Sequence, residues 1–544
     1  MIARVCIAVA LAVILGVPFV LSLSAEGGSD IPDDAPRLIV VTPHVQQIQE
    51  EFAHAFDRWH RQQFDSPAGI DYRTPGGTTE IRRQLEAQYN AALKSGRYEL
   101  DASDPDNPRV VLPDATVEFD LFFGGGSYDH TQVANGIPFE VPADRSPTGE
   151  PLPLRVSMAQ PAGFEQWQLD EWYADNVIGP QTLYHPEQLW LGTALSSFGI
   201  VYNTDLYDNK LGLPHPTGFE DLTRPELFGW VALADPRQSG SITTTFDSIL
   251  GNHGWDDGWH ILRAMSGNTR YFTSSSTKPP TDVSQGDAAA GLAIDFYGRG
   301  QAQTAGRGRV GYVDPAGAVY IDADPVTLLN GAPNPDLARR FMEFCLTEEA
   351  QALWQFPALD TPEGESNPLS PVTGNRMGPE HYELRRMPVR REMYEKHWDR
   401  LMDKVNPFEI ASDVQNPGWR TGVQVMMGCF AIDSADECRD AWEAILEAEA
   451  DPDFPADVAA RMRAMFFEWP VTPVDENGAF TTGDPVREIP WTEADYADVR
   501  NSWRPSGAQS RAEIYYTQWF RRQYADIRAM HRTEAILQTE GAGS

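Results

Sequence analysis

The strongest constraint on the fold is an alternation of short apolar runs with helical patterns between residues 37 and 395. After the first run, apolar residues recur at the helical positions Ile48, Phe52 and Trp59. Strands that alternate with helices predict an α/β fold with a mostly parallel sheet. The β-branched and aromatic runs that predict these strands lie at 37–42, 119–123, 198–203, 230–234 and 291–297.

The last quarter of the chain shows a different pattern. Strand signals nearly vanish, and apolar residues recur at helical steps, as at Cys438, Trp442 and Ile445. We therefore expect residues 396–544 to form a helical extension of the α/β part. The composition is 41% hydrophobic and 11% aromatic, which is typical of a folded chain with a large core.

The N-terminus has the pattern of an export signal. Arg4 precedes an apolar run that ends at Leu23, and small residues and an acidic stretch follow. This arrangement predicts that residues 1–25 are a secretory signal peptide and that the mature chain begins near Ala25 or Glu26. A retained membrane anchor is the alternative, because the run approaches the length that spans a bilayer.

Three cysteines lie beyond the apolar run, at Cys345, Cys429 and Cys438. In an exported chain Cys429 and Cys438 are close enough in sequence to form a disulfide, which would leave Cys345 over. Three buried thiols are the alternative. Neither a C-x-x-C pair nor a Cys/His zinc spacing occurs.

Charge and motifs exclude several function classes. Lys plus Arg number 43 against 79 Asp plus Glu, giving a net charge of −36. This balance argues against nucleic acid and anionic lipid as partners, because both need clustered basic residues. The sequence lacks G-x-S-x-G, H-E-x-x-H and Walker A motifs, and no G-x-G-x-x-G follows a strand. We therefore expect no catalytic residues.

Turns rich in Gly, Ser and Thr leave strands or approach helix starts. At such a turn the helix N-terminus offers free backbone N–H groups, and Gly lets a ligand approach them closely. Several such turns together predict a site for an anionic or oxygen-rich ligand, whereas ordinary helix caps are the alternative for each one singly. The candidate ligand-binding residues in these turns are Thr78, Thr79, Gly125, Gly126, Ser127, Ser239, Gly240 and Ser241.

The order of these segments resembles a known family. The chain is similar to the extracellular solute-binding proteins of ABC importers, in the ferric-iron-binding branch of the type-2 periplasmic binding fold. The most specific matching piece runs from Ala323 through Asp324-Pro325 to Pro335. The resemblance covers roughly residues 37–395, and its other pieces lie at 38–44, 119–126, 201–204 and 219–241.

The resemblance implies two α/β lobes joined by crossovers, with the ligand in the cleft between them. Lobe 1 would comprise 37–135 and 300–395, and lobe 2 would comprise 136–299, with the extension at 396–544. The lobes would close over the solute by hinge motion and present it to an ABC permease in the inner membrane. The implied protein is a periplasmic monomer, unless the N-terminal segment is retained as an anchor.

The resemblance also implies candidate metal ligands. In ferric members of the family, a His after the first strand, a Glu after a later strand and two adjacent Tyr hold Fe³⁺. His44 lies close to the family His, and Tyr297 matches one Tyr, while Phe296 stands at the other. The segment 124–127 occupies the Glu position with Gly and Ser. These Gly/Ser turns resemble relatives that bind phosphorylated or phosphonate compounds at helix N-termini.

The sequence thus predicts the solute-binding component of an ABC importer, and not an enzyme. Its cargo is expected to be a small anionic or oxygen-rich solute. Ferric iron or a ferric–anion complex and an organic phosphate or phosphonate both remain open, with Fe³⁺ as transported ligand rather than cofactor. The alternatives are an exported α/β enzyme without a recognisable motif, and a non-transport interaction protein that docks through the extension.

Overall fold

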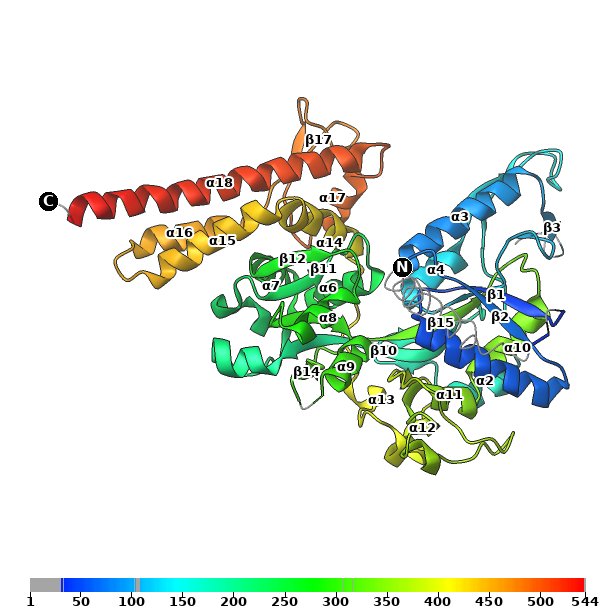
Figure 1. Ribbon diagram of the computed structural model, residues 1–544. Helices are drawn as coiled ribbons and strands as arrows, with labels where there is room; N and C mark the ends of the chain where they lie inside the picture. Colours follow the sequence, from blue (N-terminus) through cyan, green and yellow to red (C-terminus); the bar gives the residue numbers. More distant parts are fainter. Residues whose placement is uncertain are drawn as a thin grey trace, which may run out of the picture.

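The computed structural model describes residues 31–542 apart from 33, 102, 104–107, 307 and 316, with side chains as far as residue 537. The expected signal segment, residues 1–25, lies outside the described residues. Within the described part, no helix combines the length and the apolarity that a membrane crossing requires. The ribbon shows two α/β lobes side by side and a group of helices that extends beyond one of them (Figure 1).

One continuous sheet runs through both lobes. Its neighbours β1–β2, β1–β5, β11–β12 and β11–β13 are parallel, whereas β10 and β15 run antiparallel to the strands beside them. In spatial order the path is β12 (Thr269–Thr273), β11 (Val231–Ala234), β13 (Ala290–Ile294), β10 (Leu191–Asn203), β15 (Ile321–Leu328), β5 (Leu121–Phe123), β1 (Arg37–Val41) and β2 (Gly69–Arg73), and β14 (Val310–Val313) and β16 (Met387–Pro388) also pair with β10.

The long strand β10 joins the two lobes. Its first half, Leu191–Ser197, pairs with β15, and its second half, from Phe198 to Tyr202, pairs with β13. The segment before it, residues 136–195, packs in the first hydrophobic cluster with β1 and β15. We therefore propose that the lobe boundary lies within β10 rather than near residue 135.

The helices of lobe 1 cover its part of the sheet. Phe52 and Phe56 of the first long helix are fully buried against Phe341 and Phe344. The main helices of this lobe are α2 (Gln46–Phe64), α3 (Thr78–Lys94), α4 (Ser127–Asn135), α5 (Gln166–Tyr173), α10 (Pro335–Cys345) and α11 (Glu348–Gln355). Short hairpins join them, formed by β3 (Glu99–Asp101) with β4 (Arg109–Val111), β6 (Ile137–Val141) with β7 (Leu152–Val156), and β8 (Val177–Ile178) with β9 (Gln181–Thr182).

Lobe 2 and the C-terminal helices share one hydrophobic cluster. Trp442, Tyr516 and Phe520 of the extension are buried together with Ile249 and Trp259 of lobe 2. The helices of lobe 2 are α6 (Gly240–His253), α7 (Trp255–Gly267), α8 (Lys278–Gln285) and α9 (Asp295–Ala305). The extension therefore completes the core of lobe 2.

The extension begins after a third crossing between the lobes. The short helices α12 (Glu392–Lys396) and α13 (Pro407–Ile410) lie with lobe 1, and residues 411–419 lead back to lobe 2 (Figure 1). The remaining elements are α14 (Arg420–Met427), α15 (Ala435–Ala450), α16 (Ala456–Phe466), α17 (Tyr496–Ser502), α18 (Ala508–Ala542) and a small hairpin of β17 (Thr472–Val474) with β18 (Arg487–Ile489).

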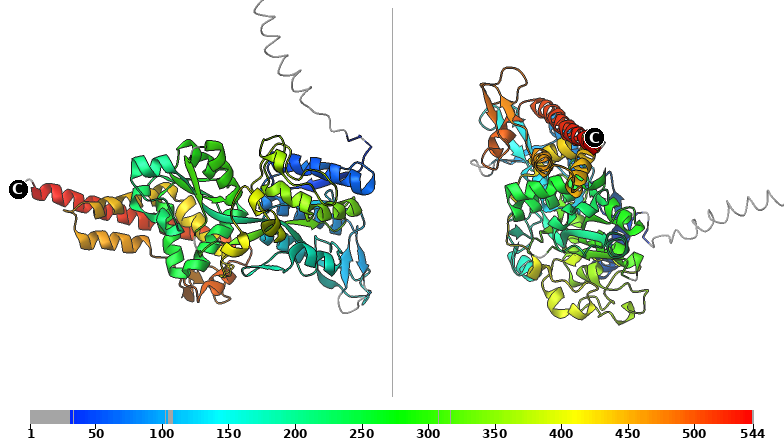
Figure 2. Two further views of the ribbon diagram at one scale, coloured as in Figure 1. Left: turned by 90° about the horizontal axis from the view of Figure 1, so that it is seen from below. Right: turned by 90° about the vertical axis from the view of Figure 1, so that its left-hand side faces the viewer.

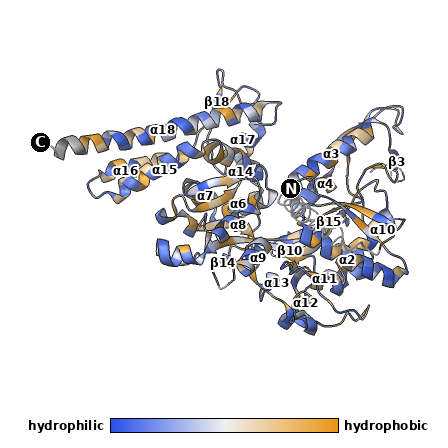
Figure 3. Ribbon diagram, in the orientation of Figure 1, coloured by the Kyte–Doolittle hydropathy of each residue, from blue (hydrophilic) through white to orange (hydrophobic). Residues whose placement is uncertain are grey.

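The C-terminal end of helix α18 extends beyond lobe 2, as Figure 1 and the left view of Figure 2 show. Along this helix polar and apolar residues alternate in the pattern of one buried face (Figure 3). The buried face carries Tyr516, Phe520 and Ile527, and it contacts α15 and α16.

The structure confirms the expected α/β class with a helical C-terminal extension. The sheet is less parallel than expected, because the antiparallel strands β10 and β15 cross between the lobes. The strand expected over 291–297 ends at Ile294, and Asp295 begins helix α9. Aromatic residues at Phe296 and Tyr297 favour a strand by composition, but they belong to the first turn of a helix.

Candidate functional site

A cleft of about 400 Å³ lies where β10 and β15 pass between the lobes. Lobe 1 contributes the starts of α3 and α4 and the turn after β1, and lobe 2 contributes the starts of α6, α8 and α9. Of the ten candidate residues, Thr79 and Ser127 do not line the cleft. The eight that do line it are His44, Thr78, Gly125, Gly126, Ser239, Gly240, Ser241 and Tyr297.

Two carboxylates of the protein itself accept hydrogen bonds from the turn that follows β5. The Ser127 hydroxyl donates to Oδ1 of Asp322 at 2.6 Å, and the Ser127 N–H donates to Oδ2 at 3.2 Å. The Gly125 N–H donates to Oδ1 of Asp324 at 3.1 Å. Burial raises the pKa of Asp322 to about 6, although the Ser127 bonds favour the ionised form. Three hydrogen-bond donors of this turn that a ligand could have used are therefore engaged internally.

The floor of the cleft holds a buried cluster of His44, Asp324 and Arg386. Arg386 forms an ion pair with Asp324 and donates from Nη1 to Nε2 of His44 at 2.7 Å. His44 Nε2 lies 3.3 Å from Oδ1 of Asp324. Burial lowers the pKa of His44, so the neutral imidazole is favoured. Burial is the largest single influence on Asp324 and would raise its pKa, but Arg386, His44 and His130 together outweigh it, so the pKa is lowered.

The lobe 2 wall is rich in hydroxyl groups and helix starts. Ser239 caps α6, and its side chain accepts from the Ile242 N–H at 3.4 Å. The first N–H groups of a helix lack partners within the helix, so Gly240 and Ser241 present such groups to the cleft. A run of hydroxyl residues, 274–277, lines the cleft just before α8.

Two arginines of the cleft were missed by sequence reasoning. Arg386 and Arg420 both line it, one from the segment before β16 and the other from the first residue of α14. Neither belongs to a motif, and the sequence offers no signal that would bring them to residues 44 or 240. The run 274–277 was visible as a Ser/Thr-rich stretch before Lys278-Pro279-Pro280, which is a helix-start pattern.

The candidate metal ligands both line the cleft. Burial raises the pKa of the Tyr297 phenol to about 12, which opposes the phenolate form. Among the described residues, no three His, Cys, Asp or Glu side chains gather in a way that could hold a metal ion. The three cysteines of the described part, Cys345, Cys429 and Cys438, are buried and free, so the buried-thiol alternative holds.

Part of the chain matches a known family. Residues 165–372 match the family of bacterial extracellular solute-binding proteins. This match confirms the resemblance to the type-2 periplasmic binding proteins of ABC importers. The family and the fold are those of solute-binding transport proteins and not of enzymes. The family is extracytoplasmic.

The curated relatives match part of the chain. An uncharacterised protein of Haemophilus influenzae is 28% identical over 145 residues, which are 26% of this chain and 41% of that protein. The phosphoglycerate transport regulatory protein of Salmonella typhimurium is 27% identical over 169 residues, 30% of this chain and 40% of that protein. The chain thus spans about two fifths of the length of these relatives.

Among solved structures, iron-bound HitA from Pseudomonas aeruginosa is similar to this chain at 14% identity. The likeness covers 72% of this chain and 98% of that one, with a TM-score of 0.45.

Proposed function

We propose that this protein captures a small solute bearing a phosphate, phosphonate or similarly compact anionic group and delivers it to an ABC permease. The lobes close over the solute by bending within β10, near Ser197 and Phe198, where the strand changes its pairing partners. The chain performs no chemistry on the solute.

One observation carries this proposal: helix starts from both lobes open onto the same cleft. Thr78 begins α3 in lobe 1, Gly240 begins α6 in lobe 2, and Thr277 precedes α8 in lobe 2. Each helix start offers free N–H groups and the positive end of the helix dipole, which together favour an anion. Hydroxyls at Thr78, Ser241 and Ser275 add neutral donors.

The carboxylates of the cleft already have partners within the protein. Asp324 pairs with Arg386, Asp322 accepts from Ser127, and Asp129 accepts from Nε of Arg82 at 3.1 Å. Their charges and lone pairs are therefore largely satisfied before a ligand arrives. An anion that enters the cleft meets donors rather than unpaired negative charge.

The same contacts weigh against ferric iron as cargo. Fe³⁺ prefers anionic oxygen ligands, but Asp324 is paired with a cation, and Nε2 of His44 accepts a hydrogen bond from that cation. Tyr297 would have to lose a proton from a phenol with a raised pKa. The relative named for phosphoglycerate transport supports an organic phosphate instead.

A thermal-shift screen tests the proposal. Phosphoglycerates, sugar phosphates, phosphonates and inorganic phosphate would be compared with neutral sugars and with ferric citrate against citrate alone. We expect at least one phosphorylated compound to raise the midpoint, since a ligand at a hundred times its Kd adds about 2.7 kcal/mol to stability. A shift with ferric citrate that citrate alone and every phosphorylated compound fail to produce would overturn the proposal.

A further inference from the structure

We propose that the C-terminal extension forms part of the binding site and supplies Arg420 as a ligand-binding residue. This inference rests on the proposed capture of an anion in the cleft. It assigns a role to a region that lies outside the matched family segment, residues 165–372.

Arg420 lies beside the helix start that lines the lobe 2 wall. Its Nη2 donates to the carbonyl oxygen of Gly240 at 3.0 Å, and its Nη1 donates to the Thr244 hydroxyl on the next turn of α6. These bonds orient the guanidinium next to the free N–H groups of Gly240 and Ser241. A guanidinium has five N–H donors, so the two bonds leave donors for a ligand.

Arg420 is also the cation of the cleft that lacks an acidic partner. Arg386 is paired with Asp324, whereas Arg420 forms no ion pair in the described part of the chain, although its charge favours the ionised forms of Asp322 and Asp247. Its guanidinium instead lies over the ring of Tyr128, 4.1 Å from the centroid. An unpaired guanidinium in a cleft suits a phosphate or carboxylate, which it can bind with two parallel hydrogen bonds.

The stacking on Tyr128 connects the two sides of the cleft. Tyr128 belongs to the first turn of α4 in lobe 1, while Arg420 is anchored on α6 in lobe 2. The contact therefore forms only when the lobes are close together. An anion held by Arg420 would lie where both lobes can reach it.

The extension holds Arg420 firmly in place. The Trp419 N–H donates to the buried carboxylate of Asp247 on α6 at 2.8 Å, and the Trp419 ring packs on Trp255 with centroids 4.8 Å apart. Gln424 donates to the carbonyl of Pro236 at 3.1 Å. Helix α14 thus starts from a fixed position against lobe 2.

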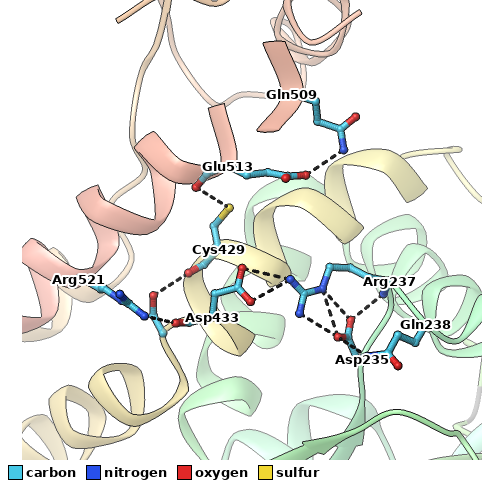
Figure 4. A network of polar contacts seen from close by, with 9 residues as sticks. Asp235, Arg237, Gln238, Cys429, Asp433, Gln509, Glu513 and Arg521 are labelled. Atoms are coloured by element: carbon cyan, nitrogen blue, oxygen red, sulfur yellow. Dashed lines mark hydrogen bonds and ion pairs between the residues drawn. The ribbon is translucent and has the colours of Figure 1, made fainter. Parts of the chain in front are cut away.

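A second contact ties the extension to the loop that leads into α6. Arg237 donates to Asp235 in its own loop and, from Nη1, to Asp433 of the extension at 2.9 Å (Figure 4). Asp433 in turn accepts through its carbonyl from Arg521 on α18. The extension therefore contacts the loop 235–239 through Arg237, and it contacts Gly240, which follows this loop, through Arg420.

Titration calorimetry on the full chain tests the assignment with 3-phosphoglycerate and inorganic phosphate as ligands. Arg420→Gln should weaken binding of the bound ligand by about ten- to a hundred-fold, because a hydrogen bond between charged groups is lost. Arg420→Lys should recover part of the affinity, since the charge remains but the forked geometry is lost. The control is Arg463→Gln on α16, which removes the same charge from the extension at a site paired with Glu449.

The outcomes separate this inference from the proposed function. If the wild-type chain binds a phosphorylated ligand and Arg420→Gln binds it equally well, Arg420 has no binding role and the proposed function stands. If Arg463→Gln weakens binding as much as Arg420→Gln, the effect is one of overall charge and the assignment is wrong. A wild-type chain that binds neither ligand nor any other anion in the thermal screen overturns both proposals.

Discussion

The guanidinium of Arg386 forms an ion pair with the carboxylate of Asp324, and both side chains are buried at the floor of the cleft. The two residues come from β15 and from the segment before β16, which both lie against β10. Phe296 lies under the guanidinium, with its ring centroid 4.1 Å away. The pair thus links the crossing strand β15 to the first turn of α9.

We expect Arg386→Gln to lower the free energy of unfolding by about 3–5 kcal/mol at neutral pH, because it leaves a buried charge unpaired. Urea unfolding measures this loss. The matched control is Arg487→Gln, whose pair with Asp498 is exposed and contributes about 0–1 kcal/mol. Equal losses for the two variants would contradict the prediction.

The same variant should respond to acid in a characteristic way. In the wild type the lowered pKa of Asp324 contributes stability that is present above the unfolded-state pKa and is lost as the pH falls through the folded-state pKa. Without Arg386, burial should raise the pKa of Asp324. In acid the carboxyl is then protonated, and the cost of burying an unpaired charge disappears. The difference in unfolding free energy between wild type and Arg386→Gln should therefore shrink toward pH 4. A constant difference would rule out the carboxylate as its cause.

For Asp295 we expect the opposite pH dependence of the unfolding free energy. Its carboxylate is buried at the start of α9 without a hydrogen-bond partner for either oxygen, and burial raises its pKa to about 7. Between about pH 4 and 7 the unfolded chain has released a proton that the folded chain retains, so this group makes stability fall as the pH rises. Asp295→Asn should raise the free energy of unfolding by about 1–3 kcal/mol at pH 8 and leave it unchanged near pH 4. The exposed Asp526→Asn on α18 serves as control, and a gain at pH 4 would refute the account.

The sequence predicted the strand–helix alternation and eight of the residues that line the cleft, because both depend on local patterns. Buried β-branched runs specify β1 and β11, and a Ser-Gly pair before an apolar helix specifies the start of α6. His44 follows β1 directly, so its place at the end of a strand was also local information. These features need no knowledge of distant contacts.

The missed features depend on contacts between distant residues. Ser127 looked available for a ligand, but its partner Asp322 is 195 residues away in sequence and reaches it only after β15 pairs with β5. Arg420 reaches Gly240 across 180 residues. Asp295 ends the predicted strand because the chain turns into α9 there, while the aromatic residues that follow favour a strand by composition.

Closure of the lobes can be tested at Gly240. A side chain there would meet the Thr78 hydroxyl at 3.0 Å and the Asp129 carboxylate at 3.1 Å, both on lobe 1. Gly240→Val should therefore hinder closure and weaken binding of a phosphorylated ligand by at least ten-fold, with little change in the thermal midpoint of the free protein. The control is Gly300→Val on α9, where the added side chain meets open space. Small-angle scattering with and without ligand would report closure, and normal compaction of the Gly240 variant would contradict the prediction.

A direct test of iron uses the colour of a phenolate–Fe³⁺ bond. If Fe³⁺ were the cargo, ferric citrate would produce a visible charge-transfer band that Tyr297→Phe abolishes. We expect no such band, because burial raises the pKa of Tyr297 to about 12 and because Nε2 of His44 already accepts a hydrogen bond from Arg386. A band that disappears in Tyr297→Phe would establish iron binding at this cleft.

The extension should be required for lobe 2 to fold. Its aromatic residues Trp442, Tyr516 and Phe520 are buried in the same cluster as Trp259. Each buried large apolar side chain contributes about 1.5–3 kcal/mol, so removing many of them exceeds the roughly 5–15 kcal/mol by which a protein is stable. Truncation after Gly418 should therefore yield a chain whose lobe 2 binds a hydrophobic dye and exchanges its amide hydrogens rapidly, while lobe 1 stays protected.

The matched truncation removes only the tip of α18. A chain that ends at Thr533 loses Ile536 and Leu537, which are 57% and 54% exposed, and keeps the buried face of the helix and the contact of His531 with Phe454. Its unfolding free energy should stay within about 1 kcal/mol of the full chain, because surface segments contribute little. Hydrogen exchange read out lobe by lobe distinguishes the two truncations. If lobe 2 remained protected without residues 419–544, the extension would be a separate unit, and Arg420 would then be held by a domain that docks on the cleft rather than by the core that forms it.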